Sequence, residues 1–181
     1  MIKMAIGEWT LSGQEYSDGV FPYRYKDHVL TFDEYKLDDP DAGFYGLAVH
    51  KGNTKGGWPH LVIVQQFAPS SEQGFNPSCL LLPETERLFV GAGERLLCYD
   101  LKTFTLLWED QTQIGFGDWS KEQGFVILSA ELEIVVFDTS GQKLWGTFVE
   151  PPWEYAIVGD NVELDIMGRE EVRCLKTGEL V

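Results

Sequence analysis

The chain has 181 residues, of which 44% are hydrophobic and 13% aromatic, enough for one domain spanning residues 1–181 to bury a core without disulfides or a metal. Twenty-nine acidic residues against fourteen basic ones give a formal net charge of -15. This charge repels phosphate groups, which disfavours nucleic acids and membrane surfaces as partners.

The N-terminus and the cysteines indicate a cytoplasmic protein. Residues 1–9 include Lys3 but have no apolar run long enough for a signal peptide or a spanning helix. Cys79, Cys98 and Cys174 are odd in number and lack CxxC spacing. We therefore expect buried, reduced thiols and no zinc or redox site.

An irregular β region is predicted for residues 1–78. Turn-forming residues separate the apolar pieces from one another. The expected strands are Met4–Leu11, His28–Phe32, Phe44–His50 and His60–Phe67, and the expected loops are Asp33–Asp41 and Lys51–Pro59.

Residues 79–181 contain three copies of a repeat, with a period of about 38 residues that is typical of repeat architectures. Leu88–Asp100, Val126–Asp138 and Leu164–Lys176 align without a gap, which places Cys98 and Cys174 at equivalent positions. In each copy an apolar strand meets a short turn and then a second strand, which is apolar on both faces in the first two copies. Such a strand must be covered on both sides, which predicts stacked antiparallel sheets.

Two further features refine this prediction. Trp108 and Trp145 occupy matching places after the first two copies, and the more polar third copy is typical of a capping unit. Residues 94–114 also have helical spacing, but the turn residues Ser140 and Gly141 at the equivalent point of the second copy favour strands.

The pattern at residues 88–108 and 126–145 resembles the blades of β-propellers, most closely those of the pyrroloquinoline-quinone type. The resembling features are a strand, a glycine turn, the segment LCYDLKT and a terminal LLW. The resemblance implies four-stranded antiparallel blades with Trp108 and Trp145 as packing residues, and it does not imply quinone binding. The segment SAELEIVVFDTSGQKLWGTFVEPPWEY also resembles small uncharacterised bacterial proteins.

The number of blades leaves the architecture open. The smallest closed propellers have about four blades. Three repeats give fewer blades than this, and a fourth blade from the N-terminal strands would only reach that number. A four-bladed ring, an incomplete propeller formed by an open stack, and a β-sandwich all fit the sequence.

Residues that could support catalysis or cofactor binding are sparse. His28, His50 and His60 lack metal-site spacing, and the acidic segment Leu37–Gly43 lacks the closing Glu of a calcium loop. Nucleotide-binding and nucleophile motifs are absent from the sequence. We expect no cofactor and no metal, while a pair of carboxylates remains available for glycoside chemistry.

Aromatic residues recur at the connections between repeats. Phe116 and Trp119 follow the first copy, and Trp153 and Tyr155 follow the second. They have two interpretations: they wedge adjacent sheets apart, or, together with Trp58 and His60, they line a recognition surface.

The leading hypothesis is a non-catalytic cytoplasmic module that binds another protein through an acidic, aromatic-bearing face. One version of this hypothesis has a basic protein as the partner. An inhibitor or immunity-type protein is one concrete form. The alternative is a small carbohydrate-binding protein or a hydrolase that uses a carboxylate pair. The sequence leaves the oligomeric state open.

Overall fold

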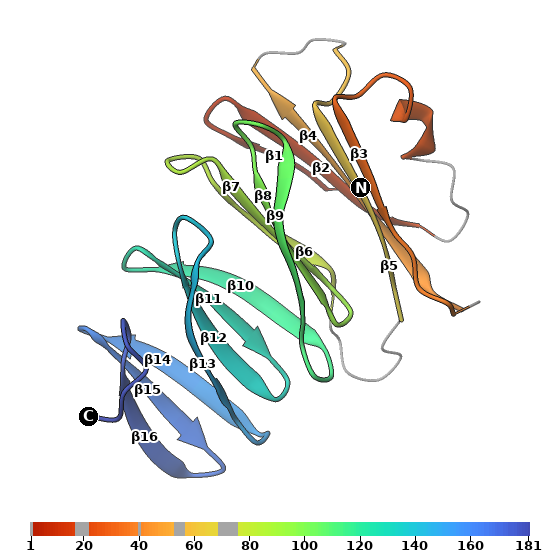
Figure 1. Ribbon diagram of the computed structural model, residues 1–181. Coiled ribbons are helices and arrows are strands. Elements are labelled where there is room, and N and C mark those ends of the chain that lie inside the picture. The colour runs from red at the N-terminus through yellow and green to blue at the C-terminus, as the bar shows by residue number, and fades with distance from the viewer. Residues whose placement is uncertain (1, 17–21, 40, 53–56, 69–75) are drawn as a thin grey trace.

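The computed structural model describes residues 2–16, 22–39, 41–52, 57–68 and 76–181. These residues form sixteen strands and one short 3-10 helix, arranged as four sheets in a row (Figure 1). The prediction of an all-β chain with stacked, blade-like sheets is confirmed, and the helical alternative for residues 94–114 is wrong.

The first sheet has five strands in the order β1-β2-β4-β5-β3. β3 runs parallel to β5, and the other pairs are antiparallel. The bounds are β1 Ile2–Ile6, β2 Trp9–Tyr16, β3 Thr31–Tyr35, β4 Gly43–Lys51 and β5 Leu61–Phe67, with the 3-10 helix η1 at Tyr23–Tyr25.

Three predictions in this region need correction. Met4–Leu11 is not one strand, because Gly7 adopts a φ of 60° and reverses the chain between β1 and β2. The strand expected at His28–Phe32 begins at Thr31 and runs to Tyr35, so the first residues of the expected loop Asp33–Asp41 are strand. Pro40, and residues 53–56 of the other expected loop, lie outside the described residues.

The remaining three sheets are antiparallel and are each built from consecutive strands. The second sheet contains β6 Ser78–Leu82, β7 Arg87–Ala92, β8 Arg95–Asp100 and β9 Thr105–Gln111. The third contains β10 Phe116–Glu122, β11 Phe125–Ala130, β12 Glu133–Asp138 and β13 Lys143–Phe148. The fourth contains β14 Trp153–Val158, β15 Asn161–Ile166 and β16 Arg169–Cys174.

The repeat is regular in the first two copies and shorter in the third. β7 begins at Arg87 and β11 at Phe125, a spacing equal to the predicted period. β15 begins at Asn161, two residues earlier than that period requires, so the gapless alignment of the third copy is wrong. A slip of two preserves the alternation of faces, which explains why the apolar pattern still matched.

Hydrophobic cores join neighbouring sheets in chain order. The first and second sheets enclose a cluster around Leu47 and Tyr99. The second and third sheets enclose a cluster around Phe89 and Phe116, and the third and fourth sheets enclose a cluster around Val136. The central strands of the second and third sheets, β7, β8, β11 and β12, therefore bury both faces, as the sequence of the first two copies predicted.

Each matched tryptophan fastens its sheet to the next. Trp108 Nε1 donates to the Gly141 carbonyl oxygen at 2.6 Å, and Trp145 Nε1 donates to the Leu175 carbonyl oxygen at 2.8 Å. Both rings are half-buried. This is the packing role that the blade resemblance implied.

The two ends of the row have different outer faces. On the first sheet, Val62 and Val64 are covered by Tyr25 and Val29 from the segment around η1. On the fourth sheet, the face turned away from the core carries the carboxylates Glu154, Glu163, Asp165 and Glu170.

The first and last sheets lie at opposite ends of the row, so the described residues form an open stack and neither a ring nor a two-sheet sandwich (Figure 1). No helix among the described residues is long and apolar enough to cross a bilayer. The three cysteines are free thiols, and Val172, not Cys174, takes the place of Cys98 in its strand.

Candidate functional site

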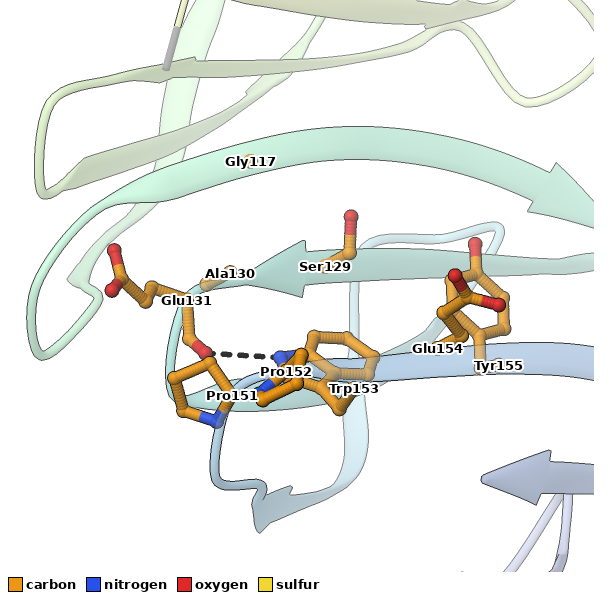
Figure 2. Close-up of a pocket in the computed structure, with 9 residues that line it drawn as sticks. All are labelled: Gly117, Ser129, Ala130, Glu131, Pro151, Pro152, Trp153, Glu154 and Tyr155. Carbon is orange, nitrogen blue, oxygen red and sulfur yellow. Dashed lines mark hydrogen bonds between the residues drawn. The ribbon is translucent and has the colours of Figure 1, made fainter. Parts of the chain in front are cut away.

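A groove of about 680 Å³ lies where the third sheet meets the first strand of the fourth. Side chains and backbone from β10 and β11 form one wall, and β14 with the residues before it forms the other (Figure 2). The groove is lined by Gly117, Ser129, Ala130, Glu131, Pro151, Pro152, Trp153, Glu154 and Tyr155.

Trp153 is held in the groove by a hydrogen bond of its indole ring. The indole Nε1 donates to the carbonyl oxygen of Glu131, at the turn between β11 and β12, at 2.9 Å (Figure 2). The carbonyl of Pro152 accepts from Met167 N at 3.0 Å, which ties the preceding segment to the turn of the fourth sheet. The ring is therefore anchored at both its edge and its backbone.

The groove exists because the third sheet has a serine, Ser129, at the position where the second sheet has a glycine, Gly91. Phe116 and Trp153 both open the first strand of their sheets and pair with the ends of β11 and β15. Phe116 packs directly on Gly91, where an added Cβ would stand 2.4 Å from the ring. Ser129 lies one repeat period after Gly91 and has a Cβ atom, so the Trp153 ring cannot pack against its backbone as closely as Phe116 packs against Gly91.

Tyr155 forms the far end of the groove. It corresponds to Trp119 of the third sheet, since a bulge at Gly117 accounts for one extra residue in β10. The Tyr155 and Ser120 hydroxyls share a hydrogen bond of 2.9 Å, and the Trp153 and Tyr155 rings lie 6.2 Å apart. Both rings are half-buried and offer apolar surface beside polar atoms.

Apart from Tyr155, the ionisable side chains that line the groove are the carboxylates of Glu131 and Glu154. Glu131 and Glu154 lie at its two ends, with the Trp153 indole between them (Figure 2). Oε2 of Glu131 is buried without a hydrogen-bond partner among the described residues. An aromatic face between two negative charges suits a ligand that is flat, cationic or rich in hydroxyl groups.

The negative surface continues beyond the groove. A smaller depression of about 310 Å³ on the outer face of the fourth sheet shares Glu154 and Tyr155 with it. Glu163, Asp165 and Glu170 also line that depression. The groove therefore opens onto the acidic end of the molecule.

Of the six predicted binding residues, Trp153 and Tyr155 line the groove. Phe116 and Trp119 are 1% and 5% exposed within the core between the second and third sheets, which is the wedging role of the alternative interpretation. Their side chains do not reach the surface in this structure.

Trp58 and His60 lie in the segment just before β5 of the first sheet, and neither lines the groove. Trp58 is 52% exposed and stacks on His28, with ring centroids 4.3 Å apart. His60 stacks on Phe104, and its Nδ1 accepts from Lys51 N at 3.2 Å, so it has a structural role. The described residues contain no cluster of three or more His, Cys, Asp or Glu suited to a metal ion.

Sequence reasoning missed the polar half of the groove. Ser129 and Glu131 belong to the repeat, and a comparison of Ser129 with Gly91 was the available signal. Nothing in the spacing of Glu131 distinguishes it from the other acidic residues.

A second cavity of about 470 Å³ lies between the first sheet and β6. Its lining is mainly apolar and includes Met4, Leu11, Tyr45 and Cys79. Tyr45 Oη donates to Cys79 Sγ at 3.9 Å, and burial raises the pKa of the Cys79 thiol to about 11. This cysteine is therefore a protonated packing residue near neutral pH and not a nucleophile.

Comparison with known proteins gives similarity of fold only. No family model and no curated protein matches the sequence. Among solved structures, BamB from Moraxella catarrhalis is 13% identical with a TM-score of 0.46, and the match covers 83% of this chain and 49% of that one.

Two other neighbours are similar to the same degree. The CNH domain of AfRom2 is 14% identical with a TM-score of 0.43, covering 80% of this chain and 52% of that one. Hsv2 from Kluyveromyces lactis is 13% identical with a TM-score of 0.44, covering 79% and 47%. These neighbours are β-propellers, and the chain spans about half the length of each.

Proposed function

We propose that the chain is a non-catalytic protein-binding module, and that its partner docks in the groove between the third and fourth sheets. The observation that carries the proposal is the pair of half-buried aromatic rings, Trp153 and Tyr155, set between carboxylates in an open groove. Aromatic side chains with apolar bodies and polar edges are the usual anchors of protein interfaces.

The charge of the molecule favours a basic partner. The net charge of -15 is spread over the whole chain, and the groove itself has Glu131 and Glu154 but no basic side chain in its lining. Opposite charge speeds the encounter, while the aromatic contacts set the lifetime of the complex. A cytoplasmic location and an inhibitor or immunity role belong to the same proposal and rest on the sequence alone.

A carbohydrate is the second candidate ligand, because an indole face flanked by carboxylates is also a sugar platform. The hydrolase form of this alternative needs both carboxylates to act on one bond. Glu131 and Glu154 lie at opposite ends of the groove, with the indole between them, which favours binding over cleavage (Figure 2).

The test is a parallel screen of the purified chain against a displayed peptide library and a glycan array. We expect selection of basic peptides whose association rate falls when salt is raised from about 50 to about 500 mM, with little change in dissociation. Trp153→Ala and Tyr155→Ala are expected to raise the dissociation rate by about tenfold or more.

Trp58→Ala is the matched control, since Trp58 is exposed on the outer side of the first sheet. It should leave the kinetics unchanged. Selection of glycans and no peptide would replace the proposal with its alternative, and a large effect of Trp58→Ala would move the binding face to the first sheet.

A further inference from the structure

We infer that the groove binds an arginine side chain from an extended segment of the partner, with the guanidinium over the Trp153 indole and beside Glu154. The inference rests on the proposed function and names the chemistry that the same groove recognises. Four features of the described residues support it.

The first feature is uncompensated negative charge. Glu84, Glu109 and Asp110 each form an ion pair with a lysine or arginine. Glu131 and Glu154 form no ion pair with any described residue. Two carboxylates without ion-pair partners within one groove attract a cation.

The second feature is a rigid aromatic face. The hydrogen bond from Trp153 Nε1 to the Glu131 carbonyl, 2.9 Å long, fixes the orientation of the ring. Tryptophan is the aromatic side chain that attracts cations most strongly. A ring that is already oriented loses little conformational freedom when a cation stacks on it.

The third feature is the combination of an aromatic face, the Trp153 indole, with a nearby hydrogen-bond acceptor, the Glu154 carboxylate. This combination favours arginine over lysine. A planar guanidinium can stack on the indole and still donate in its own plane to a carboxylate such as Glu154. The ammonium group of lysine is a point charge and gains less from this arrangement.

The fourth feature is a free strand edge along the groove. β14 pairs only with β15, and β10 pairs only with β11. The edge of β14 that faces the groove therefore has backbone N–H and C=O groups without strand partners among the described residues. An extended segment can add to such an edge while it places alternate side chains in the groove.

The test uses three end-blocked peptides of glycine and serine whose central residue is arginine, lysine or citrulline. Citrulline keeps the planar shape of arginine without its charge. The readout is the indole N–H resonance of Trp153 in NMR titrations, assigned by its disappearance in Trp153→Phe. We expect the arginine peptide to bind about tenfold tighter than the citrulline peptide, with lysine between them.

Glu154→Gln should weaken the arginine peptide by about tenfold and leave the citrulline peptide unchanged. Glu163→Gln is the matched control, because it removes the same charge from the outer face of the fourth sheet without touching the groove. Equal affinity for arginine and citrulline peptides, or equal losses in the two Gln variants, would overturn the inference.

The two proposals can fail separately. A selected partner that depends on Trp153 but is not displaced by the arginine peptide overturns the inference and leaves the proposed function standing. If the screen yields glycans and no Trp153-dependent peptide, both are overturned.

Discussion

Gly91 and Ser129 occupy equivalent positions in the second and third sheets. The difference between them decides whether the first aromatic residue of the next sheet packs closely against the strand or leaves a groove. An added Cβ at Gly91 would lie 2.4 Å from the Phe116 ring. We predict that Gly91→Ser lowers the free energy of unfolding by about 1–3 kcal/mol, because Phe116 must leave a close-packed site. Urea denaturation measures the change.

Ser129→Ala is the control for this substitution. It removes only a hydroxyl group, whose hydrogen bond to the Asp118 carbonyl oxygen is long at 3.4 Å. We expect it to change the free energy of unfolding by less than about 0.5 kcal/mol. Equal stability of Gly91→Ser and the parent chain would show that the Phe116 ring does not need this close approach.

A second feature at the residue scale is the polar cluster between β3 and β8. Tyr99 Oη donates to Asp33 Oδ2 at 2.8 Å, and the Tyr35 and Tyr99 hydroxyls share a hydrogen bond of 2.7 Å. Burial raises the pKa of Tyr99 far above its usual value, and burial raises the pKa of Tyr35 to about 12. Both phenols are thus held protonated in the folded chain.

This cluster predicts a loss of stability at alkaline pH. Because the folded pKa of Tyr35 lies above the unfolded value of about 10, its contribution is complete below pH 10 and is lost as the pH rises toward 12. The free energy of unfolding should fall less steeply in Tyr35→Phe than in the parent chain between pH 10 and 12. Parallel curves for the two proteins would contradict the assignment.

At the scale of the element, the last strands of the second and third sheets are held through their tryptophans. Trp145 donates to Leu175, and an added Cβ at Gly178 would lie 2.7 Å from its ring. We predict that Trp145→Ala lowers the free energy of unfolding by about 2–3 kcal/mol, below the range for fully buried tryptophans since the ring is half-buried.

Trp58→Ala is again the matched substitution, at a ring that is 52% exposed. Its effect should stay within about 0.5 kcal/mol. Comparable losses in Trp145→Ala and Trp58→Ala would remove Trp145 as a fastening between sheets. Chemical denaturation followed by circular dichroism distinguishes the two cases.

The sequence predicted the elements best where both faces of a strand are buried. The segments Leu96–Tyr99 and Ile134–Phe137 were located correctly because a short unbroken apolar run between turns is typical of a strand covered on both sides. β3 was placed too early because Asp33 and Glu34 are acidic, and only their parallel pairing with β5, which is distant in sequence, makes them strand residues. The residues of the groove were half predicted, since an aromatic pattern shows where rings occur but not which joint stays unfilled.

At the scale of the whole molecule, the four sheets form a linear arrangement. Each core joins one sheet to the next, and the outer faces at the two ends differ, one covered by aromatic residues around Tyr25 and the other acidic. The charge count alone predicted an acidic surface. It could not predict that unpaired carboxylates gather at the fourth sheet, because that depends on which residues alternate outward along β15 and β16.

The contiguity of the sheets has a consequence for synthesis on the ribosome. Because β6–β9, β10–β13 and β14–β16 are each continuous in sequence, a growing chain completes its sheets in the order in which they stack. Each finished sheet then offers an apolar face as a template for the one that emerges next. Of the contacts between these four sheets, the one that contains the groove forms after the other two, so a nascent chain acquires the proposed binding surface only once the first three sheets are in place.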